Sequence, residues 1–177
     1  DKTLKDGDIL NIDVTVIVDG WFGDTSRMYV AGKLPRKAER LINVTHDALM
    51  RGIDAVKPGN TFGDIGHTIQ AFVESHRMSV VRDFCGHGLG RVFHAPPNVL
   101  HYGRPGTGAI LEAGMFFTIE PMVNLGRPET KTLSDDWTAV TRDKSLSAQF
   151  EHSVGVTEDG CEIFTLSPSG RFHPTYV

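Results

Sequence analysis

The 177-residue sequence has little of what stabilises a protein covalently or places it in a membrane. Two cysteines, Cys85 and Cys161, are too few for a disulfide framework. No apolar run approaches the roughly 18 residues of a membrane-spanning helix, and we see no signal-peptide pattern. There is no run of Lys or Arg, and the formal net charge is −4. We therefore expect neither a disulfide-stapled secreted domain, nor a membrane partner, nor a nucleic-acid partner.

Apolar residues are nevertheless present in the amount that a folded core needs. The hydrophobic fraction is 40% and the charged fraction 23%, which is typical of a globular domain and not of a disordered chain. Since a domain takes up about 150 residues, we expect residues 1–177 to form one domain.

Strand-like and helix-like patterns occupy separate parts of the chain. Residues 8–18 and 21–30 are rich in β-branched side chains and flank the turn signal Asp19-Gly20. Helical periodicity covers residues 37–56 and continues from an N-cap at Thr61 to about residue 76. Strand patterns return at residues 115–119, 137–141, 148–156 and 162–166. This segregation predicts an α+β fold.

Two carboxylates mark the first pair of predicted strands. Asp13 lies between Ile12 and Val14 in the most apolar strand, where a buried charge is costly unless a positive group compensates it. Simple hairpin pairing should place Asp13 opposite Asp24 on the adjacent strand. Two carboxylates at that distance need a cation or a shared proton. The alternative is that Asp13 faces solvent and Asp24 is a turn residue.

Three further candidates lie in the second half of the chain. His87 has a glycine on each side, in a Gly- and Pro-rich stretch (residues 84–108) that we expect to be a loop carrying the site. Glu120 ends an apolar strand before Pro121, and Glu151 lies inside a later strand. Four acids and one imidazole favour Mn, Fe, Co or Zn, and they exceed the ligand number of one tetrahedral zinc. We therefore expect two cations about 3.5–4 Å apart and a metallohydrolase.

Two other histidines lie near these candidates. His94 follows His87 in the same stretch, ahead of Pro96-Pro97. His152 follows Glu151 directly, so strand alternation should turn it to the opposite face. We interpret His152 as a structural histidine.

Five sequence blocks together resemble the type I methionine aminopeptidases. The longest runs from Phe84 through Cys85-Gly86-His87-Gly88-Leu89-Gly90 to His94 and on to Tyr102. The others are Asn11-Ile12-Asp13, Gly23-Asp24-Thr25-Ser26, Thr118-Ile119-Glu120-Pro121 and Gln149-Phe150-Glu151-His152. The resemblance is to the bacterial enzymes and covers essentially the whole chain.

The resemblance implies a fold and a reaction. The fold would be the "pita-bread" fold, a curved antiparallel sheet with helices on its outer face. The reaction would be removal of the initiator methionine from new polypeptides whose second residue is small. The cofactors would be two divalent cations, with Co, Mn, Fe, Zn and Ni not distinguished. The location would be the cytoplasm, and the partners nascent polypeptide N-termini near the ribosome.

The resemblance also assigns roles to individual residues. Asp13 would bind one metal, His87 and Glu120 the other, and Asp24 and Glu151 would bridge both. Glu120 would also relay a proton from the attacking water, and His94 would hydrogen-bond the substrate and stabilise the tetrahedral intermediate. The methionine pocket would be lined by Phe93, Met122 and Trp137, for which ordinary core packing is the alternative. Ser147 would contribute to a monovalent-cation site.

The sequence departs from the family pattern at its start. A helical segment and a further substrate-binding His that precede the first ligand strand in the family have no counterpart before Asp1. We therefore expect this chain to be the C-terminal portion of the catalytic domain, with a separate chain as one source of the remainder. Three alternatives stay open: a fragment that binds metal without turnover, a non-catalytic binding protein on this fold, and a proline-specific aminopeptidase or dipeptidase.

Overall fold

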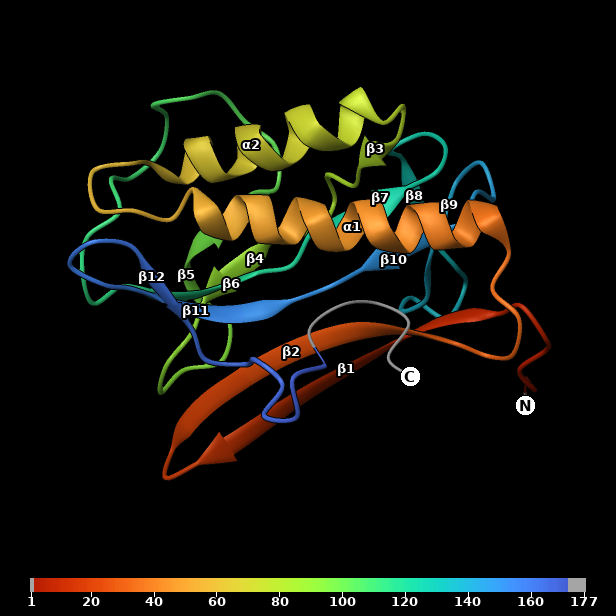
Figure 1. Cartoon of the computed structure of the whole chain (residues 1–177), viewed down its shortest axis with the longest axis horizontal. Helices are drawn as coiled ribbons and strands as arrows, with labels where there is room; N and C mark the ends of the chain where they lie inside the picture. Colours follow the sequence, from red (N-terminus) through yellow and green to blue (C-terminus); the bar gives the residue numbers. More distant parts are fainter. Residues whose placement is uncertain (1, 172–177) are drawn as a thin grey trace.

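A computed structural model describes residues 2–171. The helices are α1 (Arg36–Asp54) and α2 (Phe62–Ser75). The strands are β1 (Ile9–Val18), β2 (Trp21–Val30), β3 (Ser79–Val80), β4 (Gly86–Gly88), β5 (Ala95–Val99), β6 (Phe116–Ile119), β7 (Met122–Asn124), β8 (Thr130–Thr132), β9 (Ala139–Thr141), β10 (Ser147–Gln149), β11 (His152–Val156) and β12 (Cys161–Ile163). The order is a hairpin, two helices and then short strands, so the α+β prediction is confirmed (Figure 1).

The hairpin of β1 and β2 forms where the sequence predicts it, but in a different register. Asp19 and Gly20 have φ angles of 50° and 80°, the left-handed pair that a two-residue hairpin turn requires. This tight turn pairs Val18 with Trp21 and therefore Asp13 with Ser26. The predicted direct pairing of Asp13 with Asp24 is wrong. The two lie diagonally on the same face of the hairpin.

Helices α1 and α2 lie side by side over one face of the sheets (Figure 1). Helix α1 buries one stripe of apolar side chains, among them Leu41, Ala48 and Ile53. Helix α2 begins with the predicted cap. The Thr61 hydroxyl accepts from the Asp64 N–H, and the Asp64 carboxylate accepts from the Thr61 N–H at 2.7 Å.

The short strands form antiparallel sheets beneath the helices. A five-stranded sheet has the order β12-β11-β6-β4-β5, and a three-stranded sheet has the order β10-β7-β3. Strands β8 and β9 pair separately. The core between helices and sheets contains Leu41, Ile65, Ile69, Phe117 and Ile119, each at most 1% exposed.

Tertiary pairing subdivides two predicted segments. The stretch predicted as a loop over residues 84–108 contains β4 and β5, because the backbone at His87 pairs with Asn98 on one side and that at Gly88 pairs with Phe117 on the other. The predicted strand over residues 148–156 is two strands in different sheets. Its break is at Phe150 and Glu151, where the Glu151 N–H donates to the Ser26 carbonyl instead.

Within residues 2–171, neither helix has the length and apolar character needed to cross a membrane.

Candidate metal centre

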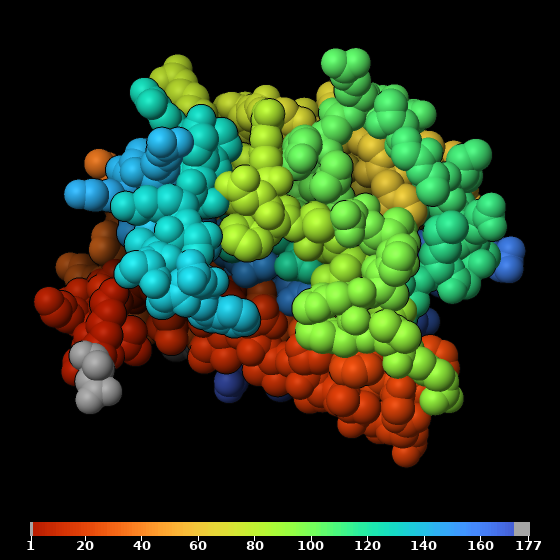
Figure 2. Space-filling model, turned by 180° about the vertical axis from the view of Figure 1, so that it is seen from behind, coloured from red at the N-terminus to blue at the C-terminus, as the bar shows by residue number. Residues whose placement is uncertain are grey.

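One cavity of about 810 Å³ gathers nearly all of the candidate site residues. In Figure 2 the surface is hollowed between the red hairpin, the cyan β8–β9 segment and the yellow-green segment before β5. The predicted residues that line the cavity are Asp13, Asp24, His87, Phe93, His94, Glu120, Met122, Trp137 and Glu151. Segments far apart in the sequence therefore meet around one space.

His87 lies on β4, and its ring is held by the backbone carbonyl of the next residue, Gly88. A Cβ at Gly86 would lie 2.4 Å from the Thr118 carbonyl oxygen, and one at Gly88 would lie 2.2 Å from the Pro96 carbonyl oxygen. Both flanking positions therefore require glycine. The Nδ1 atom of His87 lies 3.1 Å from the Gly88 carbonyl, which can only accept a hydrogen bond. This contact keeps a proton on Nδ1 and turns Nε2 toward Asp24 and Glu120, where Nε2 can bind a metal once it has lost its own proton.

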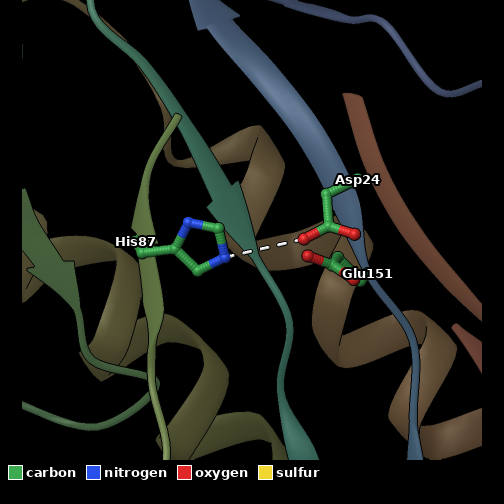
Figure 3. Close-up of side chains that lie close together, drawn as sticks. All are labelled: Asp24, His87 and Glu151. Atoms are coloured by element: carbon green, nitrogen blue, oxygen red, sulfur yellow. Dashed lines mark ion pairs between the residues drawn. The ribbon is translucent and has the colours of Figure 1, made fainter. Parts of the chain in front are cut away.

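Asp24, His87 and Glu151 form the tightest group of potential ligands. One ligand atom from each lies within 4.8 Å of the others, and all three residues are buried. His87 Nε2 is 3.6 Å from Asp24 Oδ2 (Figure 3). Glu151 is 1% exposed, and its Oε1 has no hydrogen-bond partner among the described residues. A buried carboxylate oxygen without a donor fits a site built for a cation.

Hydrogen bonds between hydroxyl side chains and the backbone connect β2 to the start of β11 and hold Asp24 and Glu151 close together. The Ser153 hydroxyl accepts from the Asp24 N–H at 3.1 Å and donates to the Asp24 carbonyl at 2.7 Å. The Thr25 hydroxyl donates to the Glu151 carbonyl at 2.9 Å. The break between β10 and β11 thus presents Glu151 beside Asp24.

Glu120 and Asp13 extend the group on either side. Glu120 Oε1 lies 3.6 Å from His87 Nε2, at the end of β6 where Pro121 follows. Asp13 lies on the exposed strand β1 and lines the cavity from the hairpin side. Of the two alternatives for Asp13, exposure is the one found, although its side chain still lines the cavity.

Burial and the charges of neighbouring acids strongly shift the pKa values of the carboxyl groups in this site. Burial raises the pKa of Glu151 to about 10, and the negative charges of Glu120, Asp24 and Asp13 add to this. Burial also raises the pKa of Glu120 to about 7. Although burial favours neutral His87, hydrogen bonds to Asp24 and Gly88 and the nearby acids raise its pKa. With its acids ionised the site would hold four carboxylates and one imidazole, an excess of negative charge that a divalent cation would neutralise.

The other predicted residues lie around this centre. His94 is exposed, and its ring centroid is 4.4 Å from that of His87. Phe93 stacks on Phe22 with ring centroids 5.3 Å apart. Met122 lines the cavity, and Trp137 is 89% exposed at its rim.

Two more predicted residues lie beside the centre. Ser147 is not among the cavity-lining residues, and its hydroxyl donates to the Val123 carbonyl at 3.3 Å. His152 bonds to the Thr165 hydroxyl at 2.8 Å, as a structural histidine would.

Sequence reasoning missed the residues that support these ligands. The Thr15 hydroxyl donates to Asp24 Oδ1 at 2.7 Å, and Gln149 Nε2 donates to Glu120 Oε2 at 3.2 Å. Thr118 and His101 also contact Glu120. Thr15, Thr118 and Gln149 stand two residues from a ligand in an extended segment, a spacing that places them on the ligand's face and could have indicated them.

The donor set fits divalent cations. Carboxylate oxygens and one imidazole suit Mn, Fe, Co and Zn, whereas no thiolate is among the ligand atoms of the group. The unpartnered Glu151 oxygen and the His87 Nε2 atom both lie in this group. The residues present are therefore compatible with a metal centre.

Comparison with known proteins places this site in a family. Residues 1–158 match metallopeptidase family M24. The chain is 62% identical over 177 residues to a methionine aminopeptidase of Rickettsia prowazekii, covering 99% of this chain and 68% of the relative. It is 55% identical to the methionine aminopeptidase of Escherichia coli K12 over 165 residues, covering 93% of this chain and 62% of that relative. The chain thus spans about two thirds of the length of these relatives.

Solved structures agree with this placement. The methionine aminopeptidase of Rickettsia prowazekii superposes with a TM-score of 0.92 at 63% identity, covering 93% of this chain and 67% of that one. The prolidase of Pyrococcus furiosus superposes with a TM-score of 0.73 at 24% identity over 94% of this chain and 44% of that one, which shows a shared fold. The predicted pita-bread fold is therefore confirmed. The chain belongs to metallopeptidase family M24, within which it groups with the bacterial type I methionine aminopeptidases.

Proposed function

We propose that this protein is a metal-dependent aminopeptidase that removes an N-terminal methionine from polypeptides whose second residue is small. The observation that carries the proposal is the convergence of five donors, Asp13, Asp24, His87, Glu120 and Glu151, on one cavity. The identity to methionine aminopeptidases supports the choice of substrate. The proline-specific peptidases are the weaker alternative, because their likeness is one of fold at 24% identity or less.

The arrangement of the donors supports two cations. Asp24 and Glu151 are central, Asp13 lies on the hairpin side, and His87 and Glu120 lie on the sheet side. We assign the central pair as bridging ligands, Asp13 to one cation, and His87 with Glu120 to the other. When bound, such cations would polarise the substrate carbonyl and make a water molecule acidic enough to attack near neutral pH.

Glu120 is the group best placed to move a proton. It is a largely buried carboxyl beside His87 that lines the cavity, where it can accept a proton from a water molecule and pass it on. Gln149 donates to its Oε2 atom and Thr118 to its Oε1 atom, so the carboxylate has one orientation.

Neighbouring side chains are suited to holding the substrate. His94 is exposed at the cavity with a φ of 56° and can hydrogen-bond the peptide group of the substrate. Phe93, Met122 and Trp137 supply an apolar wall for a methionine side chain.

The test of this proposal is hydrolysis of Met-Ala-Ser by protein that has been stripped of metal and reloaded. We expect methionine release in the presence of Co²⁺ or Mn²⁺, none with a chelator, and much slower cleavage of an Xaa-Pro peptide. Preferential cleavage of the Xaa-Pro peptide would assign the protein to the proline-specific group. Metal binding without any hydrolysis would favour a non-catalytic metal-binding role.

Further parts of the proposal concern the surroundings of the enzyme. Nascent polypeptide N-termini near the ribosome would be the substrates, and the cytoplasm would be the location, since its reducing conditions suit the free thiols of Cys85 and Cys161. Ser147 would contribute to a monovalent-cation site on β10.

The outer face of the hairpin suggests that another polypeptide segment contributes to activity. Ile12, Val14 and Val16 on this face are 46%, 49% and 52% exposed. A cavity of about 500 Å³ adjoins them and includes Trp21 and Phe164 among its lining residues. An apolar patch of this kind marks an interaction surface. We propose that a segment supplied as a separate chain covers it and completes the substrate pocket.

Adding such a segment should increase turnover. The probe is the part of the Rickettsia prowazekii methionine aminopeptidase that lies outside the match, which is about a third of that relative. We expect it to bind and to raise the rate of Met-Ala-Ser hydrolysis, and Val16→Asp on the exposed face to weaken its binding. Thr157→Asp, on the loop between β11 and β12, is the matched control. An unchanged rate with metal-loaded protein would count against a contributing segment.

A further inference from the structure

Thr118 lies between two of the proposed metal ligands. It is 0% exposed on β6, where it pairs with Ser153 of the neighbouring strand. Its hydroxyl accepts a hydrogen bond from the His87 N–H at 3.0 Å and lies 2.9 Å from Glu120 Oε1. One buried hydroxyl therefore contacts the backbone of one ligand and the carboxylate of another.

The direction of these two hydrogen bonds follows from the chemistry of the groups. A backbone N–H can only donate, so the Thr118 oxygen is the acceptor toward His87. The hydroxyl proton then remains for Glu120 Oε1, which must accept it. This bond leaves Glu120 Oε1 as an unprotonated oxygen whose position is set by the sheet, 3.6 Å from His87 Nε2.

His101 holds the same ligand from behind through its backbone. The pairing of β6 with β11 ends at Ile119, and Pro121 follows Glu120. The Glu120 N–H therefore has no hydrogen-bond partner in the pairing of these two strands. It donates to His101 Nε2 at 3.0 Å. His101 is 2% exposed, and a Cβ at Gly66 of α2 would lie 2.7 Å from the Leu100 carbonyl oxygen. Helix α2 thus packs directly against the backbone on both sides of His101, which keeps this segment next to the end of β6.

We propose that Thr118 and His101 are positioning residues for Glu120, which hold its carboxylate ready for a divalent cation beside His87. Thr118 fixes the position of Glu120 Oε1, and His101 fixes the position of the Glu120 backbone N–H. The inference rests on the metal site of the proposed function. Residues that orient ligands in this way contribute strongly to metal affinity, because the ligands already have the geometry that the metal requires before it binds.

The chain offers a matched control for Thr118. Thr45 is also 0% exposed, and its hydroxyl donates to the Leu41 carbonyl within α1 at 2.7 Å. Replacing either threonine by valine removes one buried hydroxyl at nearly constant volume. Only Thr118 touches the ligands, so a merely structural role would give both substitutions the same effect.

The experiment compares Co²⁺ binding by the unaltered protein, Thr118→Val, Thr118→Ser and Thr45→Val. The readouts are affinity by calorimetry and the visible absorption spectrum of bound Co²⁺. We expect Thr118→Val to weaken binding by about 10–100-fold and to change the spectrum. Thr118→Ser keeps the hydroxyl and should restore both, and Thr45→Val should match the unaltered protein in both.

A second pair of variants tests His101. His101→Gln keeps an acceptor and His101→Leu does not, so we expect the leucine variant to bind Co²⁺ more weakly than the glutamine variant. Equal binding by these two would remove His101 from the inference.

The outcomes separate this inference from the proposed function. Unaltered affinity and spectrum in Thr118→Val would overturn the positioning role alone. Absence of Co²⁺ binding by the unaltered protein would overturn both the metal site and the positioning role.

Discussion

Replacing Glu120 by glutamine should lower the rate of methionine release by about 10²–10⁴-fold, the range expected when a general acid–base group is removed. Glutamine keeps the size of the side chain but cannot take up a proton. The measurement is the rate of Met-Ala-Ser hydrolysis by metal-loaded protein, with the complementing segment present.

Two companion variants make this result specific. Glu112→Gln changes an exposed acid outside the cavity lining and should leave the rate unchanged. His94→Ala should reduce turnover while the metal content stays nearly the same, because His94 is assigned to the substrate and contacts the ring of His87 but is not among the proposed ligands. Metal loss in His94→Ala would make His94 a ligand, and a normal rate in Glu120→Gln would refute the assignment of Glu120 as the base.

Metal-free protein should lose stability as the pH rises from about 7 toward 10, and a divalent cation should restore it. Burial raises the pKa of Glu120 from 4.5 to about 7 and that of Glu151 from 4.5 to about 10. Both carboxyls therefore bind a proton more tightly in the folded protein than in the unfolded chain. Their contribution is fully present below pH 4.5 and is lost as the pH rises through 7 toward 10.

The other three candidate ligands and two buried histidines define the window of this effect. Burial and the charge of Asp24 raise the pKa of Asp13, so this residue acts in the same sense as the two glutamates. Burial lowers the pKa of His101 to about 3 and that of His152 to about 4, so these two make the protein more stable as the pH rises to their ordinary value of 6.5. His87, with a raised pKa, adds to the loss of stability above its ordinary value of 6.5. Asp24 has a lowered pKa and acts in the opposite sense, since its contribution is lost only as the pH falls below its ordinary value of 3.8. The net decline should therefore lie between about pH 7 and 10, above the range in which the histidines act.

The measurement is the unfolding temperature across this pH range, with chelator and with Mn²⁺. At 100 times its Kd, the cation should stabilise the protein by about 2.7 kcal/mol, which is roughly 5–10 °C for a chain of this size. Glu151→Gln mimics the protonated carboxyl, so its metal-free form should depend less on pH and gain less from Mn²⁺. A metal-free protein that grows more stable from pH 7 to 9 would contradict the arrangement of acids described above.

Local chemistry alone determined much of this protein. The hairpin follows from Asp19-Gly20, and α2 begins at Thr61 because that residue and Asp64 cap each other. The five candidate ligands were predicted from acids in apolar strands, from a histidine between glycines and from the resemblance of these blocks to a known family. Each of these features depends on a few consecutive residues, so the sequence by itself sufficed to predict them.

Only the tertiary structure decided how these parts meet. The break that presents Glu151 beside Asp24 depends on the Ser26 carbonyl of β2, to which the Glu151 N–H donates. The contacts of Thr118 with the His87 N–H and of His101 with the Glu120 N–H join residues 31 and 19 positions apart, so only the fold brings them together. Hydrogen bonds between distant segments form only when helices pack on sheets, and no local pattern in the sequence records them.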